Sequence, residues 1–226
     1  MDEMISSSNI SESFEKAKYS SAGKAIGILL FIYIIVMIAY FLSQRYRVSY
    51  TNNEIEKYKR FLLIDGNYLN DNNRHGMKLK DFYVASAYLP YMGKNQRFEY
   101  ASEKILEKVI ESGCRFVLLD IFNDNLSQDA LPIVSNGYEK GNWTYTLNSL
   151  YFEKICQSIA EKAFNNGYVN NFEDPFFIAL NLKTNKNHKT LNRVQEAIFK
   201  YLKQYLLPSK YGKQSQFIGD VHISEL

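Results

Sequence analysis

The chain has 226 residues, of which 46% are hydrophobic and 23% charged, so it is neither a disordered protein nor one built wholly of membrane helices. This length is too short for a complete eight-stranded β/α barrel, which needs roughly 250 residues. A net charge of +3 gives no indication of nucleic-acid binding, and two cysteines without a Cys-x-x-Cys spacing argue against a disulfide framework and a structural zinc site.

The first predicted element is a membrane-spanning helix over residues 24–44. Residues 25–42 carry no charge, and at about 1.5 Å per residue they are long enough to cross the hydrocarbon core of a bilayer. Residues 1–23 are polar and rich in serine, and we expect them to be disordered or weakly helical. Residues 45–61 follow as a polar linker or helical stalk. The sequence therefore predicts a single-pass membrane protein, and the excess of lysine and arginine after the span favours a cytosolic location for the rest of the chain.

Short apolar runs alternate with amphipathic helical patterns in residues 62–226, which we expect to form one α/β domain. The patterns predict helices over 99–112, 148–165 and 188–207, and strands over 82–88, 115–122, 131–135, 175–182 and 217–223. Near-continuous apolar strands separated by helices are typical of parallel pairing with right-handed crossovers. Four or five such strands would make an incomplete, half TIM-barrel-like fold.

Several segments of this domain have the order and spacing of a known family. Residues 113–122 read Gly-Cys-Arg-Phe-Val-Leu-Leu-Asp-Ile-Phe and resemble its motif Gly-Cys-Arg-x-Val-Glu-Leu-Asp-x-Trp. Residues 132–137 resemble Pro-x-Val-x-His-Gly, and residues 80–91 lie where a strand ending in Ser-His-Asn-Thr-Tyr would stand. Residues 175–182 resemble the strand Pro-x-Ile-Leu-Ser-Leu-Glu. The chain thus resembles the X region of phosphatidylinositol-specific phospholipase C over residues 78–226.

The resemblance implies a phosphodiesterase in which two histidines perform acid–base catalysis and strand-end Asn, Glu and Asp side chains hold a Ca²⁺ ion. In this chain Ala87 stands at the first histidine position and Asn136 at the second. Tyr88 stands at the position of the asparagine ligand. Leu118 and Asp120 stand at the Glu-x-Asp pair, and Asn181 stands at the final glutamate. Only the aspartate is kept. Alanine cannot carry a proton and asparagine does not titrate near neutral pH, so the resemblance predicts that catalysis has been lost.

The polar residues that remain define a candidate ligand-binding site made of Arg115, Asp120, Asn136 and Asn181. Asp120 is the one possible metal ligand among them, and a single carboxylate with neutral amides is a poor Ca²⁺ site, so we expect no bound cofactor. Structural roles are the alternative for the two charged residues. Asp120 would then cap a turn, and Arg115 would form a salt bridge or hydrogen bonds to a neighbouring loop.

Three functions stay open. The first is a membrane-anchored phospholipase-C-like domain that has lost catalysis and acts as a structural or interaction protein. The composition, rich in Lys, Asn, Ile, Tyr and Phe, suggests a large DNA virus, in which such a protein would be a membrane or minor capsid component. The second is an active phosphodiesterase with a rearranged site, although none of His75, His188 and His222 lies at a matching strand end. The third is a phospholipid-headgroup binder without turnover.

The expected half barrel has a consequence for partners. An incomplete barrel leaves edge strands with unpaired backbone groups and an exposed apolar face. We therefore expect a homodimer or a separate protein chain to cover the open half, and the 18 tyrosines and 15 phenylalanines would suit such an interface. The other expected partner is the membrane, through residues 25–42, and no nucleic acid is expected.

Overall fold

The computed structural model separates into an N-terminal unit, Met1–Tyr46, and a larger unit, Arg47–Leu226. The structure describes residues 2–57, 77–93, 97–124, 129–138, 143–170, 172–212 and 217–225. The larger unit contains the mixed α/β part of the chain, and the described residues of the smaller unit are all helical.

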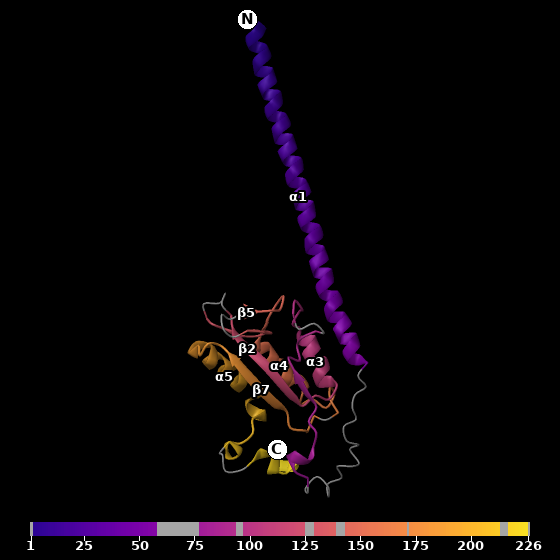
Figure 1. Ribbon diagram of the computed structural model, residues 1–226, viewed down its shortest axis with the longest axis vertical. Coiled ribbons are helices and arrows are strands. Elements are labelled where there is room, and N and C mark those ends of the chain that lie inside the picture. Colours follow the sequence, from indigo (N-terminus) through magenta and orange to yellow (C-terminus); the bar gives the residue numbers. More distant parts are fainter. Residues whose placement is uncertain are drawn as a thin grey trace. The chain divides into compact units, whose positions relative to one another are not determined.

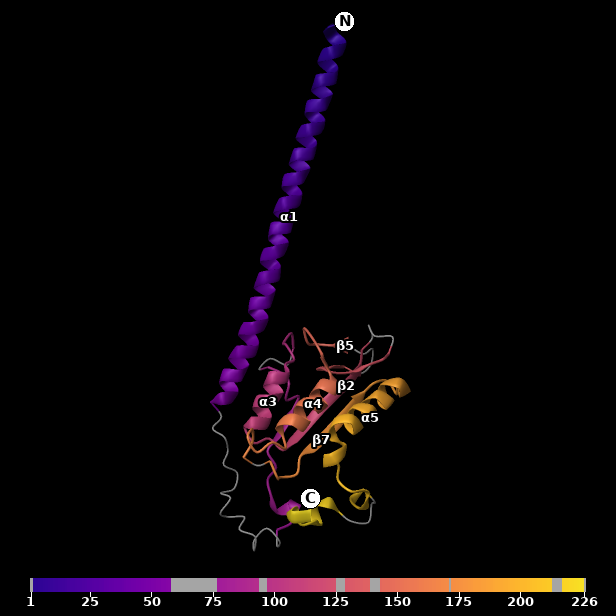
Figure 2. The same cartoon turned by 180° about the vertical axis from the view of Figure 1, so that it is seen from behind.

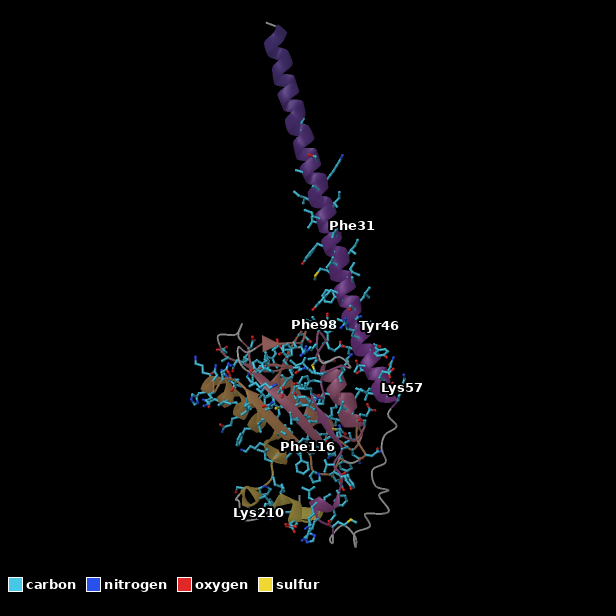
Figure 3. All side chains as sticks on the ribbon, viewed as in Figure 1. Phe31, Tyr46, Lys57, Phe98, Phe116 and Lys210 are labelled. Carbon is cyan, nitrogen blue, oxygen red and sulfur yellow. The ribbon has the colours of Figure 1, made fainter. Side chains whose placement is uncertain are left out.

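Helix α1, Asp2–Glu56, forms the N-terminal unit and ends within the larger one (Figure 1). Residues 2–23, which the sequence predicts to be disordered or weakly helical, belong to this helix. Large apolar side chains project from its uncharged stretch, and Phe31 is 64% exposed (Figure 3). The part of the helix from Ser21 to Glu56 is long and apolar enough to cross a membrane, and an 18-residue stretch of it has a mean hydropathy of 2.8, although N-terminal signal sequences share these properties.

Three parallel strands form the centre of the larger unit. Strand β2, Phe116–Asn123, pairs with β1, Ser86–Tyr88, on one side and with β7, Phe177–Lys183, on the other. The parallel pairing predicted from the apolar runs is confirmed for these strands. Strand β1 covers only the last three residues of the range predicted for it.

Three helices lie on one face of this sheet (Figures 1 and 2). They are α3, Glu103–Glu111, α4, Phe152–Lys162, and α5, His188–Leu202. Each predicted helix is therefore present and shorter than its predicted range. Helix α3 ends just before Gly113, whose φ of 98° is a left-handed conformation that glycine adopts without steric cost.

The hydrophobic core lies between the sheet and these helices. Val117, Leu119 and Ile121 of β2 are fully buried there. Their helical neighbours in this core are Leu106, Ile110, Ile155, Ile159, Val194 and Ala197. Because strand side chains alternate between faces, Phe116, Leu118 and Asp120 point to the opposite side of the sheet. We call this side, opposite to α3, α4 and α5, the open face.

The rest of the sheet departs from the predicted parallel arrangement. Strand β3, Pro132–Val134, is antiparallel to the end of β2, and β6, Leu150–Tyr151, is antiparallel to β3. A separate antiparallel pair consists of β4, Gly137–Tyr138, and β5, Trp143–Thr144. Residues 124–131, which join β2 to β3, are too few for a parallel crossover, which takes about a dozen residues or more.

The predicted strand over residues 217–223 is wrong. This segment contains the 3₁₀ helix Ile218–Asp220 and a single bridge between Lys78 and His222. Gly219 lies near the middle of this segment, and a glycine inside a strand weakens it. The other 3₁₀ helices are Leu79–Asp81, Lys203–Tyr205, Ser209–Tyr211 and Ile223–Glu225.

The last turns of α1 pack against the α/β domain. The Arg47 guanidinium donates to the Phe98 carbonyl at 2.9 Å and lies 3.9 Å from the carboxylate of Glu99, which is buried. Thr51 is also buried, and a Cβ added at Gly93 would come within 2.7 Å of Glu99 Cγ and 3.1 Å of Thr51 Oγ1. Residues 47–56, predicted to belong to a linker, thus form part of the larger unit.

Candidate functional site

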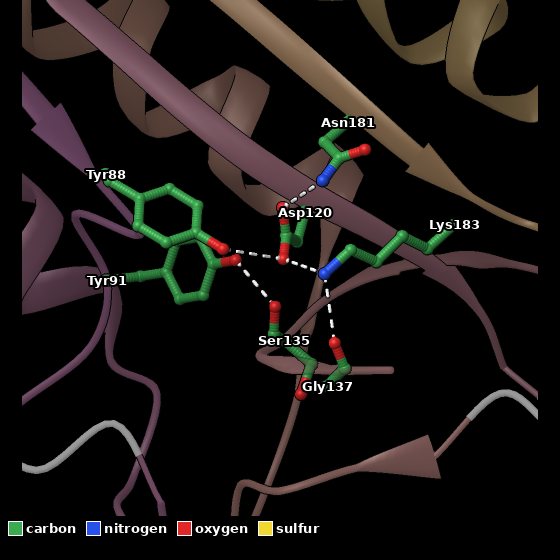
Figure 4. Close-up of polar contacts among 7 residues, drawn as sticks. All are labelled: Tyr88, Tyr91, Asp120, Ser135, Gly137, Asn181 and Lys183. Atoms are coloured by element: carbon green, nitrogen blue, oxygen red, sulfur yellow. Dashed lines mark hydrogen bonds and ion pairs between the residues drawn. The ribbon is translucent and has the colours of Figure 1, made fainter. Parts of the chain in front are cut away.

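Four polar side chains meet on the open face, toward the carboxyl ends of the parallel strands (Figure 4). Tyr88 ends β1, Asp120 lies in β2, and Asn181 and Lys183 lie in β7. The register places Asn181 directly beside Asp120. Because Lys183 follows Asn181 by two residues, both side chains lie on the same face. We call these four residues the Asp120 cluster.

Asp120 is at the centre of this cluster and is fully buried. Its carboxylate accepts hydrogen bonds from the Tyr88 hydroxyl at 3.1 Å and from the Asn181 amide at 2.9 Å, and it forms an ion pair with the Lys183 ammonium at 2.5 Å. Lys183 Nζ also donates to the Gly137 carbonyl at 2.9 Å. A buried carboxylate is tolerated only when it is paired and hydrogen-bonded, and both conditions hold. The cluster is therefore neutral and satisfied by its own side chains.

A second set of contacts, beside the cluster, involves Tyr91 and the loop after β3. The Tyr91 hydroxyl donates to the Ser135 carbonyl at 2.9 Å, and the Ser135 hydroxyl shares a hydrogen bond with that of Thr146. Burial, and then the nearby charge of Asp120, raise the pKa of Tyr91. The same two causes raise the pKa of Tyr88. Both phenols are therefore protonated at neutral pH, so they act as hydrogen-bond donors and supply no general base.

Strand alternation separates two neighbouring residues of the candidate site. Ala87, at the position expected for the first histidine, packs against the core on the helix side, whereas Tyr88 reaches Asp120 on the open face. Leu118 is aligned with Tyr88. A histidine at position 87 would thus point away from Asp120. Asn136, at the second histidine position, lies next to the site, since its neighbour Gly137 contacts Lys183.

The structure does not bring Arg115 to this site. It directly precedes β2, at the amino end of the strand, and is 4% exposed. Its guanidinium donates to the backbone carbonyls of Ala163 at 2.7 Å, Phe172 at 3.3 Å, and Asp174. Burial lowers the pKa of Arg115 to about 10, so it is still charged at neutral pH. These contacts match the alternative interpretation of Arg115, hydrogen bonding to a neighbouring loop, and they hold the guanidinium at the amino end of β2.

The described histidines lie elsewhere in the fold. His188 is the first residue of α5, and His222 forms the bridge with Lys78. Neither hydrogen-bonds to the Asp120 cluster. His75, considered as a possible contributor to a rearranged site, falls outside the described residues.

The side chains of the cluster do not fit a calcium ion. Ca²⁺ takes about six to eight oxygen ligands, several of them carboxylates. Asp120 supplies the only carboxylate of the cluster, and the Lys183 ammonium already lies 2.5 Å from one of its oxygens. No group of three or more His, Cys, Asp or Glu residues within the described ranges is placed to hold a metal ion.

Sequence reasoning named Asp120, Asn181 and Asn136 as candidates; the structure brings the first two into contact, and Lys183 was missed. The predicted strand ended at residue 182, whereas β7 includes Lys183. The sequence did indicate Lys183, because a residue two positions after Asn181 lies on the same face of an extended strand as Asn181. Only the register with β2, however, shows that this lysine reaches Asp120.

One family model matches more than half of this chain. The family model for the phosphatidylinositol-specific phospholipase C X domain matches residues 76–220. The chain is similar to the solved structures of PLC21 from L. pealei, at 19% identity and a TM-score of 0.45, and PLC21 from S. officinalis, at 19% identity and 0.46. Each match covers 58% of this chain and 15% of the other, so the chain spans a small part of those proteins. No curated protein matches it. The family match over residues 76–220 shows that the chain belongs to the phosphatidylinositol-specific phospholipase C X-domain family.

Proposed function

We propose that this chain is a phospholipase C X-type domain that has lost catalysis and acts as a structural or interaction protein, held at a membrane by residues 25–42. The observation that carries the proposal is the ion pair between Lys183 and Asp120 at 2.5 Å. The one carboxylate retained from the family's ligand set is neutralised by a lysine of the same chain. The aspartate therefore serves the fold and is not available to a substrate or a metal.

Acid–base chemistry gives a second argument. Cleavage of a phosphodiester by attack of a hydroxyl needs one group that removes the attacking proton and another that protonates the leaving oxygen. Tyr88, with its raised pKa, is a poor base, and Asp120 has its two oxygens occupied by three donors. The described part of the site thus holds no free pair of groups for proton transfer.

The contacts also weigh against headgroup binding at this site. Tyr88, Asn181 and Lys183 are the cluster's hydrogen-bond donors, and all three are directed to Asp120. A phosphate would have to displace these contacts and approach a buried negative charge, which costs free energy.

The proposal includes the architecture and location expected from the sequence. The three parallel strands of the mixed sheet, with helices on one face, have the arrangement expected in half of a β/α barrel, and the exposed apolar helix is suited to span a bilayer. Such a protein would fit a virion membrane or minor capsid, where the anchor holds the domain against a protein shell.

A cleavage assay tests the loss of catalysis. The full chain is incubated with vesicles containing phosphatidylinositol, with Ca²⁺ and separately with chelator, and the release of soluble inositol phosphates is measured. Asp120→Asn is the matched variant, because it keeps the shape of the side chain and removes its charge. We expect no release by the wild-type chain above that of Asp120→Asn. Release by the wild-type chain above that of vesicles without protein would refute the proposal, and its loss in Asp120→Asn would assign the activity to this site.

A further inference from the structure

Strand β7 has a free edge among the described residues. It pairs with β2 along one side, and no described strand pairs with its other side. Leu182 is 43% exposed, and Ile178 and Leu180 are only partly buried although they face the helices. A seven-residue strand with one unpaired edge presents backbone N–H and C=O groups to which another strand can form hydrogen bonds.

The hydrogen bonds to β2 fix which backbone groups point to the free edge. Phe177 N–H donates to the Arg115 carbonyl on the β2 side at 2.7 Å. Because backbone groups of a strand alternate in direction, those of Ile178, Leu180 and Leu182 point away from β2. The free edge therefore offers the backbone groups of three aliphatic residues, spaced two apart.

We propose that two copies of this chain pair through β7, antiparallel, about a two-fold axis at Leu180. In this register Leu180 faces Leu180 of the other copy, and Ile178 faces Leu182. Those are the hydrogen-bonded positions of an antiparallel ladder, in which facing residues exchange both N–H···O bonds, so every outward-pointing group gains a partner. The facing side chains are all aliphatic and lie on the same side of the joined sheet, as stabilising cross-strand pairs require.

The chemistry of the edge selects a second copy as the occupant. A two-fold interface must be complementary to itself. This holds for the aliphatic residues of β7, because Ile178 lies two residues before Leu180 and Leu182 lies two residues after it. On the open face, the same register sets Lys183 of one copy opposite Phe177 of the other, so no like charges meet. The pairing does not depend on whether the Asp120 cluster is catalytic.

An apolar groove beside β7 supports this register. The groove has a volume of about 700 Å³, and Ile178 and Leu180 line it together with Phe164, Tyr205 and Leu206. The exposed Leu182 of the other copy would lie opposite Ile178, at this groove. The two-fold axis gives two such contacts, each of which removes an exposed leucine from water.

Sedimentation of the full chain in detergent micelles tests the pairing. We expect a protein mass of twice 26.3 kDa for the wild type. Leu182→Asp should sediment as a monomer, because it would bury a carboxylate opposite Ile178. Tyr83→Asp is the matched control, since Tyr83 is fully exposed and lies outside β7, and it should stay dimeric. A monomeric wild type, or a dimer that survives Leu182→Asp, would overturn the proposal.

Disulfide cross-linking tests the register. In the proposed pairing the two Leu180 Cα atoms lie about 5.5 Å apart, within disulfide range, so Leu180→Cys should cross-link under mild oxidation. Ile178→Cys should not, because its two copies are offset by four residues, or about 13 Å. The native Cys114 and Cys156 are buried and give little background. Equal cross-linking at both positions, or none at Leu180→Cys, would contradict the two-fold axis at Leu180.

Discussion

Replacement of Lys183 by methionine should destabilise the α/β domain strongly. Methionine keeps most of the side-chain volume and removes the ammonium, which leaves Asp120 fully buried with only Tyr88 and Asn181 as donors. Removing one partner of a buried ion pair costs about 3–5 kcal/mol. Because the Lys183 side chain is 17% exposed, we expect about 2–4 kcal/mol. For a chain of this size, 3 kcal/mol corresponds to a fall of about 6–12 °C in Tm.

The structure offers a matched control for this experiment. Lys200 pairs with Glu153 at 2.6 Å, almost the same distance as in the buried pair, but the two side chains are 62% and 50% exposed. Water screens such a surface pair, so we expect Lys200→Met to change stability little. Urea unfolding followed by the fluorescence of Trp143, the single tryptophan, gives the free energy of unfolding of both variants.

A double variant separates the charge from the packing. Asp120→Asn combined with Lys183→Met removes both charges, and we expect it to recover much of the stability lost in Lys183→Met, because no unpaired buried charge remains. The reasoning would be refuted if Lys183→Met lost no more stability than Lys200→Met, since Asp120 would then not depend on the lysine.

Three further predictions concern other parts of the domain. Arg115→Lys should lower the free energy of unfolding by about 2–4 kcal/mol, measured with urea, because one ammonium cannot replace a guanidinium that serves three carbonyls; an unchanged urea midpoint would contradict its structural role. Arg47→Ala should destabilise the domain by about 1–2 kcal/mol by leaving the buried Glu99 without its cation, whereas Arg47→Ala in a Glu99→Gln background should cost less. Burial raises the pKa of Cys156 to about 12, above that of an unfolded thiol, so its contribution to stability is complete below about pH 8.5 and is lost as the pH rises toward 12. Cys156→Ala should reduce the fall in the free energy of unfolding at alkaline pH. The same fall in the wild type and the variant would contradict this prediction.

The sequence by itself determined the features that depend on local or periodic patterns. The uncharged run after residue 24, the amphipathic helices and the apolar strands follow from the spacing of hydrophobic residues, which sets the element type within a segment. The order and spacing of several segments, among them Gly-Cys-Arg followed by Asp120, resembled one family, and the family match confirms that resemblance. Boundaries were less accurate, and the strand predicted over 217–223 failed because a short apolar run with a glycine suits a turn as well.

Only the tertiary structure decided which side chains meet. Lys183 reaches Asp120 from another strand, Tyr88 faces the site while Ala87 faces the helices, and Arg115 lies at the amino end of β2. These assignments depend on strand register, in which a shift of one residue moves every side chain to the other face. Hydrophobic patterns locate a strand to within a residue or two, and that uncertainty is enough to exchange the residues of the site with those of the core.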